Sequence, residues 1–242
     1  MNKLFLHSNK VLHCAVHKGG SQWMSKILEI ICSNYNLKMK IFEGHSRMKE
    51  YPDVDVLYDN NSSVILHGEN YIGSHMIRDP RDIIISGYFY HLLHNPSEKY
   101  YDNMTYKDKL QRLSFNDGIM FEMENIGGQT INIINKWNYN NPKFIEVKYE
   151  NVISNPEEMF TKIFQHWGIN PLYIEHCLDI ARQCHMTQLT GRKVGEEVYG
   201  AHIRNGKHGQ WKDHFSSHHK EKFKSLFRNL LIKLGYEKDD KW

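Results

Sequence analysis

The chain has 242 residues, of which 40% are apolar and 24% are charged, and its formal net charge is +3. This length supports one substantial hydrophobic core, so we expect a single domain over residues 1–242. The mild charge, with no cluster of Lys and Arg interleaved with aromatics, argues against a nucleic-acid partner. No run approaches the ~20 apolar residues of a membrane helix, and the apolar part of the opening MNKLFLHSNK is too short for a secretory signal. We therefore expect a cytoplasmic protein without membrane association.

The cysteines and histidines raise the question of disulfide and metal sites. The cysteines show neither a CxxC nor a disulfide-framework spacing, so we expect them to be reduced core thiols. They are Cys14, Cys32, Cys177 and Cys184. The closest helical pair of histidines, His214 and His218, lies in a polar stretch without a third ligand nearby. We therefore expect no bound metal.

Short apolar runs bounded by turn residues alternate along the chain with stretches of helical periodicity. The apolar runs that predict strands are residues 11–16, 39–44, 62–68, 71–80 and 143–151. The stretches that predict helices are residues 21–35, 81–94, 127–140, 154–169 and 216–234. Strands that alternate with helices predict an α/β fold, with a mostly parallel central sheet flanked by helices.

Local signals mark the ends of some elements. Asp79-Pro80 ends a strand and caps the next helix, and Ser154 or Asn155 caps a later one before Pro156 in its first turn. Residues 97–117 are polar and rich in tyrosine, which is typical of a mobile segment over a site. Residues 186–210 are glycine-rich and basic, which predicts a loop.

Residues 17–24, HKGGSQWM, form a loop between the first predicted strand and the first predicted helix. Backbone N–H groups at such a helix start attract an anion, to which Lys18 adds a charge and Ser21 a hydroxyl. The lysine precedes Gly19 and Gly20, whereas the cradle G-x-x-x-x-G-K-[ST] places it after the glycines. An ordinary glycine turn with a solvent-exposed lysine is the alternative.

Two later segments also have the residues of a phosphate site. Arg78 ends a strand and Ser86 follows two turns into the next helix, so both can face the crevice at the carboxyl edge of the sheet. The alternative is an ion pair of Arg78 with Asp79 or Asp82. Residues 203–215, IRNGKHGQWKDHF, carry cations among glycines and can fold over a polyanion, although a solvated basic loop would look the same.

In this order along the chain, the segments resemble the sulfotransferases that use 3′-phosphoadenosine 5′-phosphosulfate (PAPS). The resemblance rests on strand–K-x-G-x-x-W–helix, R-[DN]-P-[RK]-D-x-x-x-S, Y-E-[DN] followed by N-P and a helix, and R-x-G-x-x-G-x-W-K-x-H-F. These motifs occur within residues 11–30, 62–92, 145–168 and 184–221. The resemblance implies the P-loop-like fold of that family.

The resemblance also implies a site that binds PAPS and releases 3′-phosphoadenosine 5′-phosphate (PAP) without a metal. The residues at the 5′-phosphosulfate would be Lys18, Gly19, Gly20, Ser21 and Gln22. The residues at the 3′-phosphate would be Arg78, Ser86, Arg204, Asn205 and Gly206. The residues at the adenine would be Trp23, Tyr149, Met186 and Ile203. The chain departs from the family pattern at His17, Gln22 and Asn205, where proline, threonine and lysine are usual.

The reaction that the resemblance implies is an in-line attack of an acceptor oxygen or nitrogen on sulfur. Lys18 would stabilise the charge on the leaving oxygen, and Ser86 belongs to the same catalytic set. A histidine would take the acceptor proton, and His67 stands at the family's position for it. The other candidates for this base are His45, His91 and His94.

The acceptor is expected to be a small organic molecule, such as a secondary metabolite. An aromatic wall for it would consist of Tyr88, Phe89, Tyr90, His91, Tyr100 and Tyr101, and the alternative is that some of these residues belong to the core. Ser216-Ser217 replace the threonine-valine of the family's dimer segment, so we expect a monomer or a weak homodimer. A nucleotide or metabolite kinase with a P-loop and a non-catalytic nucleotide-binding protein remain alternatives. The kinase would need a lysine after the last loop glycine and carboxylates for magnesium.

Overall fold

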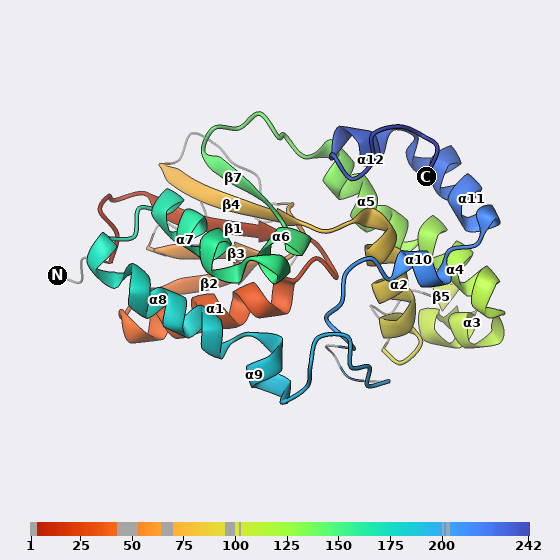
Figure 1. Ribbon diagram of the computed structural model, residues 1–242, viewed down its shortest axis with the longest axis horizontal. Coiled ribbons are helices and arrows are strands. Elements are labelled where there is room, and N and C mark those ends of the chain that lie inside the picture. Colours follow the sequence, from red (N-terminus) through yellow and green to blue (C-terminus); the bar gives the residue numbers. More distant parts are fainter. Residues whose placement is uncertain are drawn as a thin grey trace. The chain divides into compact units, whose positions relative to one another are not determined.

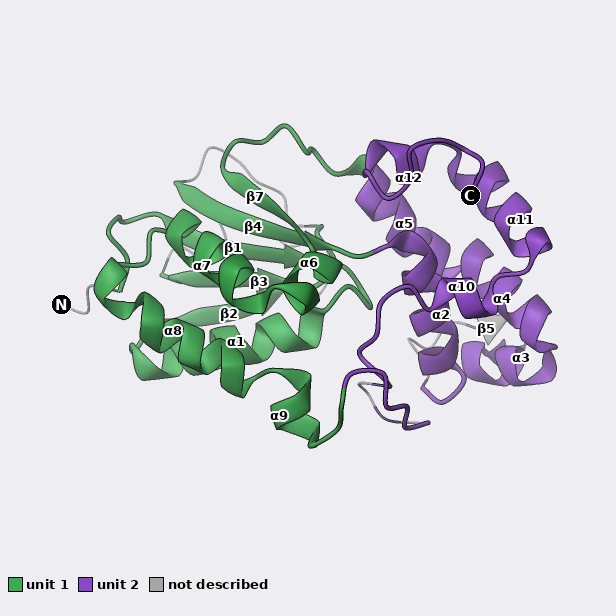
Figure 2. Cartoon of the chain, in the orientation of Figure 1, with its two compact units in different colours: residues 1–78, 136–193 green, residues 79–135, 194–242 purple. Residues whose placement is uncertain are grey.

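The structure is a computed structural model in which two compact units are each assembled from separate stretches of the chain (Figure 2). Unit 1 comprises residues 1–78 and 136–193, and unit 2 comprises residues 79–135 and 194–242. The residues that the structure describes are 4–42, 53–63, 70–94, 100–101, 103–199, 201 and 204–242. A single domain over the whole chain stays a prediction.

Unit 1 is built on a five-stranded sheet with the strand order β2-β3-β1-β4-β7, and all its neighbouring strands are parallel (Figure 1). The strands are β1 (Lys10–Ala15), β2 (Met39–Phe42), β3 (Val56–Asp59), β4 (Tyr71–Ile77) and β7 (Phe144–Lys148). Residues 11–15 of the central strand β1 are fully buried, as expected for a parallel strand that is covered on both faces. The predicted α/β fold with a parallel sheet is confirmed.

The helices of unit 1 bury apolar residues against the sheet or against one another. They are α1 (Ser21–Asn34), α6 (Tyr149–Ser154), α7 (Pro156–His166), α8 (Pro171–Gln183) and α9 (Met186–Thr190). In α1, Met24, Ile27, Leu28 and Ile31 are buried at helical spacing, and they share one core cluster with residues of α7 and α8. The predicted helix after the glycine loop is therefore confirmed.

Unit 2 is mostly helical. Its helices are α2 (Pro80–His91), α3 (Tyr106–Arg112), α4 (Phe115–Glu124), α5 (Ile126–Lys136), α10 (Trp211–His214), α11 (Ser217–Phe227) and α12 (Leu230–Lys233). Its two short strands, β5 (Tyr100–Tyr101) and β6 (Met104–Thr105), pair antiparallel. Asp79 caps α2 as predicted, since its side chain accepts a hydrogen bond from the backbone N–H of Arg81 and Pro80 follows at the first position. In the part of the chain that is described, no helix is long and apolar enough to span a bilayer.

Some predicted elements differ from the structure. The described part of residues 97–117, which were predicted as a mobile segment over a site, contains β5, β6, α3 and the start of α4. The helix predicted over 216–234 is split into α11 and α12 at Arg228, whose φ of 46° lies in the left-handed region. Strand β3 is not among the predicted strands, and of the strand predicted at 62–68 only residues 62–63 are described.

Candidate functional site

The loop between β1 and α1 has the backbone of an anion cradle. Lys18 has a φ of 61° and Gly20, the N-cap of α1, has a φ of 97°. A Cβ at Gly20 would lie 2.8 Å from the Tyr149 ring and 3.1 Å from the Met76 sulfur, so only glycine fits without a shift of these neighbours. Gly20 caps the helix without a side-chain hydrogen bond. The N–H groups of the first turn of α1 can therefore donate to a bound anion.

Arg78 follows β4 and reaches the same loop. Its Nη1 donates to the backbone carbonyl of Lys18 at 3.3 Å, and its guanidinium lies 4.9 Å from the centroid of the Tyr149 ring. Arg78 is only 6% exposed, so its position is set by packing rather than by solvent. Unit 1 thus brings together Lys18, Arg78 and Tyr149, which are far apart in the sequence.

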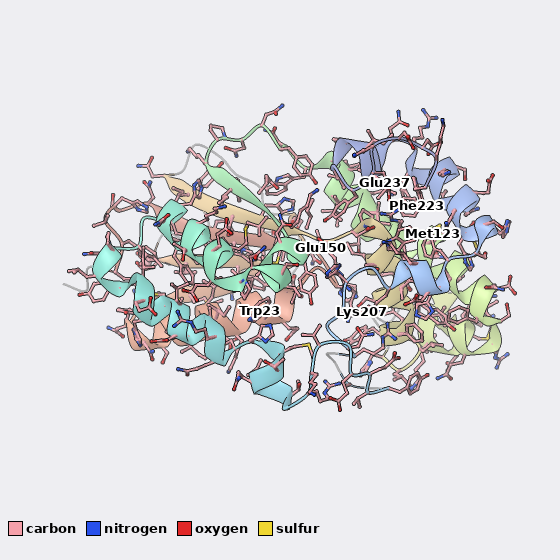
Figure 3. All side chains as sticks on the ribbon, viewed as in Figure 1. Trp23, Met123, Glu150, Lys207, Phe223 and Glu237 are labelled. Atoms are coloured by element: carbon pink, nitrogen blue, oxygen red, sulfur yellow. The ribbon has the colours of Figure 1, made fainter. Side chains whose placement is uncertain are left out.

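A mostly apolar cavity of about 280 Å³ lies beside Trp23 within unit 1. Trp23, which Figure 3 labels on α1, makes edge-on contacts with Phe160 and His185 at centroid distances of 5.2 and 5.4 Å. Leu178 and Thr187 also line the cavity. The Trp23 indole N–H is buried and has no hydrogen-bond partner among the residues described. The cavity suits a flat heterocycle that can pack against aromatic side chains.

His185 also lines this cavity. Its Nδ1 accepts a hydrogen bond from the backbone N–H of Thr187 at 3.3 Å, so the proton of the neutral ring lies on Nε2. Burial lowers the pKa of His185, which favours the neutral ring near pH 7. His185 and Thr187 are absent from the predicted site. Their only signal in the sequence is that they flank Met186, a predicted adenine contact.

Unit 2 contains the other predicted phosphate residues. The Arg204 guanidinium lies 4.0 Å from the centroid of the Phe89 ring, and its Nη1 donates to Glu197 Oε1 at 2.6 Å. Ser86, on α2, is half-buried. Arg204 is therefore held in a position where it already binds a carboxylate.

The loop that follows Arg204 is organised around one side chain. The Gln210 Oε1 accepts hydrogen bonds from Arg204 and from Asn205 Nδ2, the latter at 3.1 Å, and its Nε2 donates to the Lys207 carbonyl at 2.6 Å. Gly206 has a φ of 63°. Gln210 and Asn205 are 5% and 7% exposed, so these two polar residues lie in the interior of the loop, whereas Lys207 and His208 are exposed.

Several predicted site residues are not tested by this geometry. His45, His67 and Ile203 lie outside the residues that the structure describes, as do the side chains of Tyr100 and Tyr101. Tyr149 and Met186 are buried, at 8% and 7% exposure, and neither lines the cavity beside Trp23. Of the predicted adenine contacts, the cavity thus includes Trp23.

The other histidines proposed as a base have structural partners. His91 is fully buried, and its Nδ1 lies 2.9 Å from Glu122 Oε2, which also accepts a hydrogen bond from the Tyr106 hydroxyl. His94 is half-buried, with its Nδ1 3.1 Å from the Tyr90 carbonyl. A fully buried imidazole such as His91 has no surface for an acceptor in this conformation. Within the described ranges, no group of three or more His, Cys, Asp and Glu is arranged to hold a metal ion.

Residues 74–235 match the protein-family model described as "Sulfotransferase domain". The chain belongs to the sulfotransferase family. The matched range includes Arg78, Ser86, Tyr149 and the loop at 204–210, and it begins after the loop at 17–24. No curated protein sequence matches the chain significantly.

Two solved structures are similar to the chain, and the first of them shares its fold. The mouse sulfotransferase SULT7A1 complexed with PAP is 13% identical, and the alignment covers 95% of this chain and 87% of that one with a TM-score of 0.64. Retinol dehydratase in a complex with retinol and PAP is 14% identical, with coverages of 95% and 83% and a TM-score of 0.49. The likeness to SULT7A1 confirms the predicted P-loop-like sulfotransferase fold.

Proposed function

We propose that this sulfotransferase transfers the sulfuryl group of PAPS to a hydroxyl or amine of a small organic acceptor. The observation that carries the proposal is the hydrogen bond from Arg78 to the Lys18 carbonyl, because it holds a second cation at the glycine loop. A sulfated nucleotide is an anion, and its binding requires positively charged side chains at the site. The structurally similar SULT7A1 is complexed with PAP.

The residues of unit 1 suit the 5′-phosphosulfate and the adenine. Lys18 and the first N–H groups of α1, at Ser21 and Gln22, would bind the anionic group, while Gly19 and Gly20 let the backbone approach it. The adenine would stack on Trp23 in the cavity of about 280 Å³, where the His185 Nε2–H can donate to a ring nitrogen. The family resemblance also assigns Tyr149, Met186 and Ile203 to the adenine, although Tyr149 and Met186 do not line this cavity.

The residues of unit 2 are proposed to bind the 3′-phosphate. Arg204 holds the carboxylate of Glu197 at 2.6 Å, so its guanidinium is already oriented to receive an anion. Ser86, Asn205 and Gly206 would add hydrogen bonds, and the family resemblance also assigns Arg78, which belongs to unit 1, to this phosphate. A phosphate would replace the carboxylate of Glu197 on Arg204.

In the proposed step, the acceptor oxygen or nitrogen attacks sulfur and forms a new bond to it. The bond between sulfur and the bridging oxygen of the 5′-phosphate breaks, and that oxygen keeps the electron pair as part of PAP. Lys18 would stabilise the charge that develops there, as fixed cations do in phosphoryl transfer. Ser86 would be a further catalytic residue. His67 would accept the acceptor proton.

The proposal also includes the class of acceptor, the location of the protein, its oligomeric state and its co-substrate. The acceptor would be a small molecule of secondary metabolism rather than a nucleic acid or a membrane component. The protein would act in the cytoplasm as a monomer or weak homodimer, with PAPS as co-substrate and no metal. These follow from the composition and the family resemblance described above.

Isothermal titration of the protein with PAP, AMP and ATP in metal-free buffer tests the proposal. PAP is expected to bind far more tightly than AMP, because only PAP has the 3′-phosphate. Equal affinities for PAP and AMP would overturn the proposed donor. A preference for ATP that depends on added magnesium would instead support a kinase, and tight binding of PAP without sulfate transfer to any acceptor would support a non-catalytic nucleotide-binding protein.

A further inference from the structure

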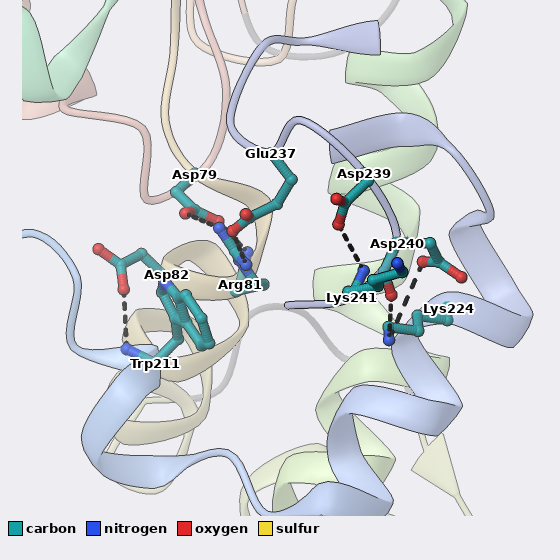
Figure 4. Close-up of polar contacts among 9 residues, drawn as sticks. All are labelled: Asp79, Arg81, Asp82, Trp211, Lys224, Glu237, Asp239, Asp240 and Lys241. Carbon is teal, nitrogen blue, oxygen red and sulfur yellow. Dashed lines mark hydrogen bonds and ion pairs between the residues drawn. The ribbon is translucent and has the colours of Figure 1, made fainter. Parts of the chain in front are cut away.

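Asp82, in the first turn of α2, holds the backbone at the start of α10. It is fully buried, and its Oδ2 accepts a hydrogen bond from the Gly209 N–H at 2.6 Å. Its Oδ1 accepts one from the Trp211 N–H at 3.0 Å (Figure 4). Hydrogen bonds to a charged acceptor are stronger than those between neutral groups, and burial strengthens them further. One carboxylate thus fixes two backbone groups on either side of Gln210.

The neighbouring Arg81 holds the side chain of the same tryptophan. Its guanidinium lies 3.7 Å from the centroid of the Trp211 ring and 4.5 Å from that of the Trp242 ring. It also pairs with Asp79 at 2.8 Å and with Glu237 at 2.6 Å (Figure 4). Because Arg81 is only 2% exposed, these contacts are shielded from water, and Trp211 is fixed through both its backbone and its ring.

Residues 235–242 supply one side of this arrangement and are themselves anchored. Lys224 on α11 donates to the Asp240 carbonyl at 2.6 Å, as Figure 4 shows. The Trp242 ring contacts the Phe223 ring edge-on at a centroid distance of 5.8 Å. The segment is therefore packed onto the rest of unit 2 at more than one point, and it can transmit a restraint to Arg81.

The restrained residues lead directly into the predicted phosphate loop. Gln210 lies between the two backbone groups that Asp82 holds, and its side chain bonds Arg204, Asn205 and the Lys207 carbonyl. A change in the backbone at Gly209 or Trp211 would move Gln210. The orientation of Arg204 would change with it.

We infer that Asp82, Arg81, Glu237 and Trp242 form a brace that fixes the phosphate-binding conformation of residues 204–210 and so sets the affinity for the 3′-phosphate. None of these four residues is proposed to touch the nucleotide. Each is a positioning residue that acts through Gln210. The inference rests on the proposed function of the loop, and it adds a supporting structure from the far end of the chain.

Titration of the protein with PAP and AMP tests the brace, using Asp82→Asn and its matched control Asp108→Asn. Asp108 occupies the first turn of α3, as Asp82 does in α2, but it is exposed. Weakening two charge-assisted hydrogen bonds is expected to raise the Kd for PAP about tenfold in Asp82→Asn while the Kd for AMP is unchanged. The control is expected to bind both ligands like the wild type.

A second variant keeps the test decisive if Asp82→Asn does not fold. Glu237→Gln removes one charge from the brace and is expected to raise the Kd for PAP about threefold, against an unchanged Kd in Glu221→Gln on the exposed face of α11. Equal losses of affinity for PAP and AMP, or no loss of PAP affinity in either brace variant, would overturn the inference about the brace but not the proposed function. A wild-type protein that does not prefer PAP to AMP would overturn the proposed function and the brace together.

Discussion

The two predicted phosphate loops are held in different ways. In the loop at 17–24, the backbone itself determines the conformation. Lys18 and Gly20 have left-handed φ values, and the Gly19 N–H donates a 2.9 Å hydrogen bond to the Val16 carbonyl. In the loop at 204–210, Gly206 and Gly209 also have left-handed φ values, of 63° and 75°, and the side chain of Gln210 links the residues of the loop to one another. Local backbone geometry is encoded by adjacent residues, whereas the second loop depends on contacts from elsewhere in the chain.

The long-range contacts of the second loop connect it to the first turn of α2. The hydrogen bonds from Gly209 and Trp211 to Asp82 join residues 127 and 129 positions apart. Substitutions far from the second loop should therefore change its ligand affinity. Substitutions that affect the first loop should be confined to the loop itself and to the residues packed directly on it.

The largest expected effect is on catalysis at the first loop. Lys18→Ala should lower the rate of sulfate transfer on the order of 10²–10³-fold, because it removes a fixed cation from the developing charge of the leaving oxygen. A coupled assay of PAP release measures this rate. Lys26→Ala, at an exposed position of α1, is the control and should keep the wild-type rate. A Lys18→Ala variant as fast as this control would contradict the role of Lys18.

The backbone of the first loop can be tested with two glycines of similar φ. Gly20 (φ 97°) would place a Cβ 2.8 Å from the Tyr149 ring, whereas Gly195 (φ 93°) has nothing within 4 Å of that position. Gly195→Ala should cost about 1 kcal/mol of unfolding free energy from backbone strain alone, and Gly20→Ala about 2–4 kcal/mol from strain and overlap together. Denaturant unfolding measures both. Equal losses would show that the packing on Tyr149 does not constrain the loop.

The smallest expected effect concerns the ion pair in the second loop. Glu197 forms an ion pair with Arg204 and would compete with a phosphate for its guanidinium. Glu197→Gln should therefore lower the Kd for PAP about two- to fivefold, as expected for a partly exposed ion pair. The Kd for AMP should stay unchanged. Glu221→Gln serves as the control. Weaker binding of PAP to Glu197→Gln would mean that Glu197 orients Arg204 for the ligand rather than competing with it.

Sequence reasoning was most successful where the signal is local. The strand, glycine loop and helix around Lys18 follow from adjacent residues, and the structure has all three. The helices within 97–117 also had local signals that the tyrosine-rich composition obscured. Thr105 and Ser114 cap α3 and α4, each with an aspartate three residues later, Asp108 and Asp117.

Other features could not be read from neighbouring residues. Strand β3 ends in Asp59, which is fully buried and accepts hydrogen bonds from the backbone N–H groups of Asn61 and Ser63 at 2.9 and 2.6 Å. A buried carboxylate in a strand is not expected without these partners. Likewise, the roles of Asp82 and Gln210 become visible only in the folded chain. The motif that contains Arg204 does not indicate which side chains fix the position of Arg204.

The loop at 17–24 is proposed to bind the 5′-phosphate, and the loop at 204–210 is proposed to bind the 3′-phosphate. The most direct test of this assignment is a titration of Lys18→Ala and Arg204→Ala with PAP and AMP in metal-free buffer. Both ligands have the 5′-phosphate, but only PAP has the 3′-phosphate. Lys18→Ala should weaken PAP and AMP alike, while Arg204→Ala should weaken PAP by about tenfold or more and leave AMP unchanged. If Arg204→Ala weakens AMP as much as PAP, or if Lys18→Ala leaves both affinities at the wild-type value, the assignment of the two loops is contradicted.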